Sequence, residues 1–114
     1  EMDPAACDTL FIAAGDENGT LEAITQKAGP KAFVIVQACY GSTLADRADL
    51  LLPMATWLER SGTFTNTEGI LQRAHAALTP SGQSRPDWDI LGRLAERLGL
   101  DAAIAKDAVL ACRV

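Results

Sequence analysis

The residues best placed to do chemistry lie in one segment, Ala48–Gln72, which reads ADLLLPMATWLERSGTFTNTEGILQ. An apolar stretch ending at Pro53 is followed by Trp57 and Glu59, and then by a run rich in Ser, Thr and Asn that ends at Thr67. Hydroxyl and amide side chains of this kind either satisfy the backbone of a loop or hydrogen-bond a polar ligand. Composition alone does not decide between a structural loop and a ligand-binding loop.

General catalytic and phosphate-binding patterns are absent from the sequence. Neither G-x-G-x-x-G nor G-x-x-x-x-G-K-[ST] occurs, and no serine stands in a G-x-S-x-G context. The single histidine, His75, has no obvious acid to orient it. The acid pair Asp16 and Glu17 fits a solvated turn, and the pair Asp87 and Asp89 fits the positive end of a helix. We therefore expect no catalytic residue in this chain.

The three cysteines, Cys7, Cys39 and Cys112, are widely spaced and include no C-x-x-C pair. Disulfide frameworks, zinc sites and iron–sulfur sites all need closer or more numerous ligands. We expect no metal site, and we expect buried, inert thiols in a reducing compartment.

Alternating strand-like and helix-like stretches must position the polar segment. Continuous apolar runs at Thr9–Ala14 and Ala32–Val36, with a third at Asp49–Leu52, are typical of parallel strands that are covered on both faces. A helix at Thr20–Ala28 and a short helix within Gly41–Ala48 would connect them. The sequence predicts an α/β fold: a small doubly wound, mainly parallel sheet with flanking helices and a Thr/Asn-rich loop or hairpin.

The second half of the chain predicts different elements. Ser61–Gly69 indicates a structured loop or hairpin, and Ile70–Leu78 an extended segment. A helix should begin near Pro86 and end at Gly99, and a final helix should follow Asp101. The apolar stripe expected to pack the first of these helices into the core comprises Trp88, Leu91, Leu94, Ala95 and Leu98.

We expect one α/β domain over residues 1–114, with a βαβ-type core at 1–53, the motif loop and extended segment at 54–78, and a linker with carboxyl-terminal helices at 79–114. The first residues, Glu1-Met2-Asp3-Pro4, resemble neither a signal peptide nor a natural translation start. We therefore expect the chain to be a fragment of a larger subunit.

Composition excludes several classes of partner. The 114 residues are 48% hydrophobic, which is enough to bury a core. A net charge of −5 argues against a nucleic-acid surface, which needs clustered cations. No apolar run approaches the roughly 20 residues of a membrane span, so we expect none.

The polar segment resembles the molybdopterin-oxidoreductase superfamily, which carries the pattern A-D-hydrophobic-hydrophobic-L-P-A-A-T-W-x-E-x-x-G-T-F-x-N-x-E-G-R-x-Q. The resemblance covers roughly Leu10 to Gly99 and is greatest to the carboxyl-terminal part of the G-type (75 kDa-type) subunit of complex I. The positions that follow the pattern are Ala48-Asp49, Leu52-Pro53, Ala55-Thr56-Trp57, Glu59, Gly62-Thr63-Phe64, Asn66, Glu68-Gly69 and Gln72.

The resemblance implies membership of the α/β domain that, in catalytic members, helps to hold a molybdopterin guanine dinucleotide. The residues it places on or near the cofactor are Gln37, Thr43, Asn66, Thr67 and Glu68. Two departures point away from cofactor binding: Ile70 replaces an Arg, and Gly15-Asp16-Glu17-Asn18 replaces a Gly-x-Asn-Pro loop. A pyrophosphate favours Arg and disfavours an added acid pair. The family's molybdenum and iron–sulfur ligands lie in amino-terminal regions that have no counterpart here.

The leading hypothesis is therefore a scaffold fragment of an NADH-quinone oxidoreductase subunit whose parent holds iron–sulfur clusters, with no cofactor in this chain. One alternative is the molybdopterin guanine dinucleotide-binding portion of a formate dehydrogenase-like Mo/W oxidoreductase. Another is a stand-alone binding or interaction module. The resemblance implies other subunits of a respiratory or dehydrogenase complex and the remainder of its own subunit as partners. It also implies a cytoplasmic location, peripheral on the inner face of the membrane through partner subunits.

Overall fold

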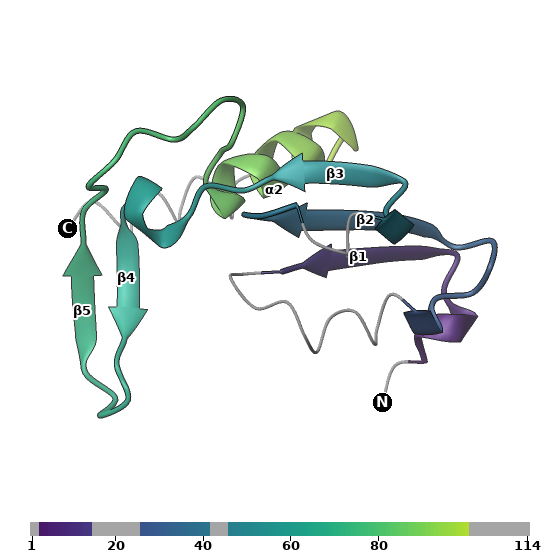
Figure 1. Ribbon diagram of the computed structural model, residues 1–114, viewed down its shortest axis with the longest axis horizontal. Coiled ribbons are helices and arrows are strands. Elements are labelled where there is room, and N and C mark those ends of the chain that lie inside the picture. The colour runs from purple at the N-terminus through teal and green to yellow at the C-terminus, as the bar shows by residue number, and fades with distance from the viewer. Residues whose placement is uncertain (1–2, 15–25, 42–45, 101–114) are drawn as a thin grey trace. The chain divides into compact units, whose positions relative to one another are not determined.

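A three-stranded parallel sheet organises the first part of the chain. The computed structural model describes residues 3–14, 26–41 and 46–100. After a short 3-10 turn, η1 (Pro4–Ala6), come β1 (Thr9–Ala13), β2 (Phe33–Ala38) and β3 (Leu50–Pro53). The strands lie in the order β1-β2-β3 and run in one direction (Figure 1). The predicted α/β fold with a mainly parallel sheet is confirmed.

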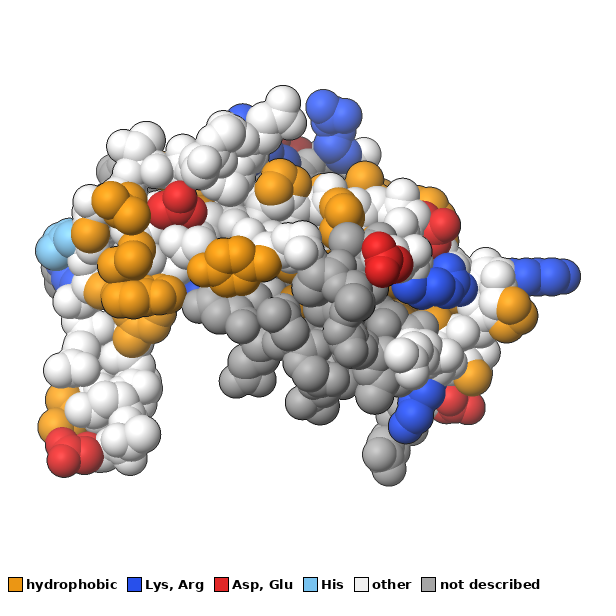
Figure 2. All heavy atoms as spheres, in the orientation of Figure 1, with side chains coloured by type: hydrophobic (Ala, Val, Ile, Leu, Met, Phe, Trp, Pro, Cys, Tyr) orange, Lys and Arg blue, Asp and Glu red, His pale blue; other side chains and the backbone are white. Residues whose placement is uncertain are grey.

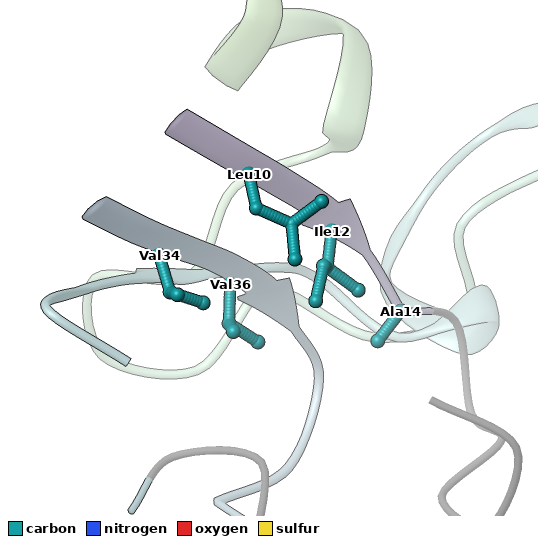
Figure 3. Packing of buried hydrophobic residues seen from close by; sticks show 5 residues of the cluster. All are labelled: Leu10, Ile12, Ala14, Val34 and Val36. Atoms are coloured by element: carbon teal, nitrogen blue, oxygen red, sulfur yellow. The ribbon is translucent and has the colours of Figure 1, made fainter. Parts of the chain in front are cut away.

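The core of this sheet comes from the alternate residues of β1 and β2. Leu10 lies beside Val34 and Ile12 beside Val36 in the strand register, and Figure 3 shows these side chains with Ala14 on one side of the strands. Val34 and Val36 are fully buried. Burying each such side chain stabilises the fold by about 1.5–3 kcal/mol. Small side chains complete the packing: Ala28, Ala38 and Ala48.

Asp49 fixes the register of β3. Its backbone N–H donates to the carbonyl of Val34 at 2.9 Å, and its carboxylate Oδ2 accepts from the backbone N–H of Val34 at 2.8 Å. At the other end, the N–H of Met54 donates to the carbonyl of Ala38 at 2.9 Å. The Asp of the A-D pair thus completes the hydrogen bonding between β2 and β3.

The chain divides into two compact units, Glu1–Met54 and Ala55–Val114. Most of the helix predicted at Thr20–Ala28, residues 42–45 of the short helix predicted before β3, and the helix predicted after Asp101 lie outside the described residues. Within the described ranges, no helix is long and apolar enough to cross a lipid bilayer.

The second unit contains a 3-10 turn, an antiparallel hairpin and a helix. These are η3 (Trp57–Glu59), β4 (Gly62–Thr65), β5 (Leu71–Ala74) and α2 (Asp87–Arg97). Strands β4 and β5 pair antiparallel, with Phe64 opposite Gln72. Of the two readings that the sequence left open for this region, loop or hairpin, the hairpin forms. The predicted extended segment is a strand only over the four residues of β5.

Helix α2 begins and ends where the sequence predicts. Pro86 precedes it, Asp87 and Asp89 lie in its first turn, and Gly99 follows with a φ of +70°. A positive φ favours glycine because it lacks a Cβ. The carboxylates at the amino end lie near the positive pole of the helix dipole.

The apolar face predicted for α2 is wrong in part. Trp88, Leu91 and Leu98 are exposed, whereas Ile90 is the one buried residue of the helix. The salt bridge of Asp87 with Arg60 holds the first turn, and Ile90 follows three residues later on the same side of the helix. Periodicity shows that apolar residues share one side of the helix, but it does not show which side is buried.

Candidate functional site

The first predicted cofactor residue lies at the carboxyl end of β2. Ligands of open parallel sheets bind beyond the carboxyl ends of the strands. Gln37 is 1% exposed, which makes it the only buried polar side chain among the described residues. Its backbone carbonyl accepts a hydrogen bond from the N–H of Ala14 at 2.8 Å, so the ends of β1 and β2 are joined at this residue.

The side-chain amide of Gln37 is incompletely hydrogen-bonded. Its Nε2 donates to the Sδ of Met54 at 3.3 Å, and a thioether sulfur is a weak acceptor. Its Oε1 is buried and has no hydrogen-bond partner in the described part of the chain. A buried acceptor left without a donor costs about 1–3 kcal/mol. An N–H or O–H group of a bound molecule that reached this oxygen would remove that cost.

The segment after β2 becomes exposed at Tyr40 and Gly41. Tyr40 is 56% exposed, and Gly41 has open space where a Cβ would stand. Thr43, the second predicted cofactor residue, lies outside the described residues.

The remaining three predicted cofactor residues lie together in the turn that joins β4 to β5. The Oδ1 of Asn66 accepts hydrogen bonds from the backbone N–H groups of Glu68 at 3.0 Å and Ile70 at 2.9 Å. Gly69, with a φ of +80°, donates its N–H to the carbonyl of Asn66. Thr67 and Glu68 are exposed. The side-chain Oδ1 of Asn66 therefore stabilises the turn. Its side-chain Nδ2 is the group suited to donate to a ligand.

Other polar residues of the motif hold the second unit together. The carboxylate of Glu59 accepts from the backbone N–H of Thr56 at 2.9 Å and from that of Ser81 at 3.1 Å. The hydroxyl oxygen of Ser61 accepts from the N–H of Ala76 at 3.0 Å. Glu59 connects η3 to Ser81, and Ser61, just after η3, connects to Ala76. These contacts are structural roles of the kind that composition allowed for this loop.

Arg60 extends this bracing and was not singled out from the sequence. Its Nη1 lies 2.7 Å from the Oδ2 of Asp87, and its Cζ lies 6.0 Å from the centre of the Phe64 ring. Its Nε is buried and has no hydrogen-bond partner among residues 3–14, 26–41 and 46–100. The sequence did contain a signal for this pair: an arginine directly follows Glu59, and an acid, Asp87, stands in the first turn of a later helix. The pair ties the start of α2 to the hairpin.

The described residues contain no group of three or more His, Cys, Asp or Glu side chains that could hold a metal ion. Cys7 and Cys39 are half-buried, so the prediction of buried thiols is wrong for both. Cys7 precedes β1 and Cys39 follows β2, at the ends of strands rather than within the packed core. Cys112 lies outside the described residues.

Comparison with known proteins identifies the family. Residues 5–97 match the family model described as Molybdopterin oxidoreductase, and this match covers most of the chain. The chain belongs to the molybdopterin oxidoreductase family. The parallel sheet and the Thr/Asn-rich hairpin that the apolar runs and the composition predicted are those described above.

Two similar proteins are much longer than this chain. A protein of Staphylococcus aureus (strain USA300) is 48% identical over 69 residues, and one of Staphylococcus haemolyticus (strain JCSC1435) is 46% identical over 69 residues. Both are named "Putative formate dehydrogenase". The aligned part is 60% of this chain and only 7% of each relative.

Proposed function

We propose that this chain is the part of a formate dehydrogenase-like molybdopterin oxidoreductase that helps to hold the dinucleotide cofactor. The observation that carries the proposal is the 48% identity over 69 residues to a relative named "Putative formate dehydrogenase". That name favours the formate dehydrogenase hypothesis over the complex I hypothesis. The chain spans 7% of the relative, so the activity belongs to a longer protein.

Gln37 supports the local part of the proposal. Its buried Oε1 lacks a donor, and the amide lies at the carboxyl end of β2. In the proposed complex this oxygen accepts a hydrogen bond from an N–H or O–H group of the cofactor. Thr43, Asn66, Thr67 and Glu68 are proposed as further cofactor contacts. When bound, a molybdopterin guanine dinucleotide carries the metal at which electrons are exchanged with substrate.

The residues of this chain bind and orient in this proposal, and none performs the chemistry. Glu59 and Ser61 fix the loops around the hairpin through their hydrogen bonds. Asn66 fixes the turn that presents Thr67 and Glu68. A rigid support of this kind lowers the ordering cost that a large cofactor would otherwise meet on binding.

The test uses the full-length protein, purified without oxygen. We expect about one molybdenum or tungsten atom for each polypeptide by mass spectrometry, and reduction of an artificial electron acceptor that depends on formate. Metal without formate-dependent reduction would leave the family role but remove formate as substrate. A preparation with neither metal nor pterin would contradict the proposal.

A second candidate, the scaffold subunit of an NADH-quinone oxidoreductase, is favoured by one feature of the hairpin. Ile70 is apolar and 52% exposed at the position where the family pattern has Arg, so it offers a pyrophosphate no charge. This candidate predicts iron–sulfur clusters in the parent, no molybdenum or tungsten, and co-purification with other subunits of the respiratory complex. The metal measurement separates the two candidates.

A further inference from the structure

We draw no further inference here: the strongest candidate, the patch of exposed hydrophobic side chains on the β4–β5 hairpin that includes Phe64 and Ile70 (Figure 2), supports no proposal because nothing in the described part of the chain shows what covers it.

Discussion

Replacing Gln37 with methionine should separate the stability of the sheet from its proposed ligand role. Methionine has nearly the length of glutamine, is unbranched and fills irregular spaces. The substitution removes the buried Oε1 that lacks a donor and also the weak hydrogen bond from Nε2 to Met54. The cofactor-free protein should become more stable, although a polar group has been lost.

The expected magnitude follows from these two groups. The unpartnered acceptor costs about 1–3 kcal/mol, and the lost bond to sulfur contributes less than about 1 kcal/mol. The free energy of unfolding should therefore rise by about 1–2 kcal/mol. With a urea dependence of about 2 kcal/mol per molar, the unfolding midpoint should rise by about 0.5–1 M.

Urea unfolding of the cofactor-free chain measures this change, with Gln72→Met as the matched control. Gln72 is exposed on β5, so the same substitution there should alter the free energy of unfolding by less than about 0.5 kcal/mol. A loss of more than about 1 kcal/mol in Gln37→Met would refute the reasoning. It would mean that the amide of Gln37 makes stabilising contacts inside the chain.

Three further substitutions test the structural roles assigned above. Asp49→Ala should lower the free energy of unfolding by about 1–3 kcal/mol because the N–H of Val34 loses its acceptor. Asp49→Asn keeps a side-chain oxygen and should retain most of the stability. Equal losses for the two variants in urea unfolding would argue against this role. Gly69→Ala should destabilise the hairpin turn by about 1–2 kcal/mol because the φ of this residue is +80°. Hydrogen exchange should become faster in the hairpin alone. Exchange at the wild-type rate would contradict the turn geometry. Trp88→Ala should lower the stability measured by thermal unfolding by about 1–2 kcal/mol, because the ring is partly exposed. A fully buried ring would cost about 3–5 kcal/mol. A loss of more than about 2 kcal/mol would place the ring in the core.

The strands could be predicted because their signal is local. The apolar runs around Ile12 and Val36 are continuous and rich in β-branched residues, which predicts strands. The expected burial on both faces is not found: β1 and β2 bury alternate residues, and Leu50 and Leu51 of β3 are exposed.

The ends of α2 were also predicted from local signals, Pro86 and Gly99. The side of α2 that faces inward was not predicted. It depends on tertiary contacts such as the salt bridge of Asp87 with Arg60, which lies on the same side of the helix as the buried Ile90.

The candidate site was predicted only as far as residue types allow. The resemblance selected Gln37 and Asn66, but hydrogen bonding distinguishes them. The side-chain Oδ1 of Asn66 accepts from two backbone N–H groups of its own turn, whereas the side-chain Oε1 of Gln37 has no donor among the described residues. An Asn three residues before a Gly, as in Asn66-Thr67-Glu68-Gly69, already indicates a side-chain-stabilised turn. The surroundings of the Gln37 amide depend on tertiary contacts such as that of Nε2 with Met54, which lies 17 residues away in the sequence.

The cofactor content of the full-length Gln37→Met protein tests the central claim most directly. Pterin is released by oxidation and quantified by fluorescence beside the wild-type protein and the Gln72→Met control. The account predicts stoichiometric pterin in the wild-type and control proteins. In Gln37→Met it predicts cofactor binding that is weaker by roughly fivefold or more, because one buried hydrogen bond is lost. Equal pterin retention in all three proteins, or none in the wild type, would contradict it.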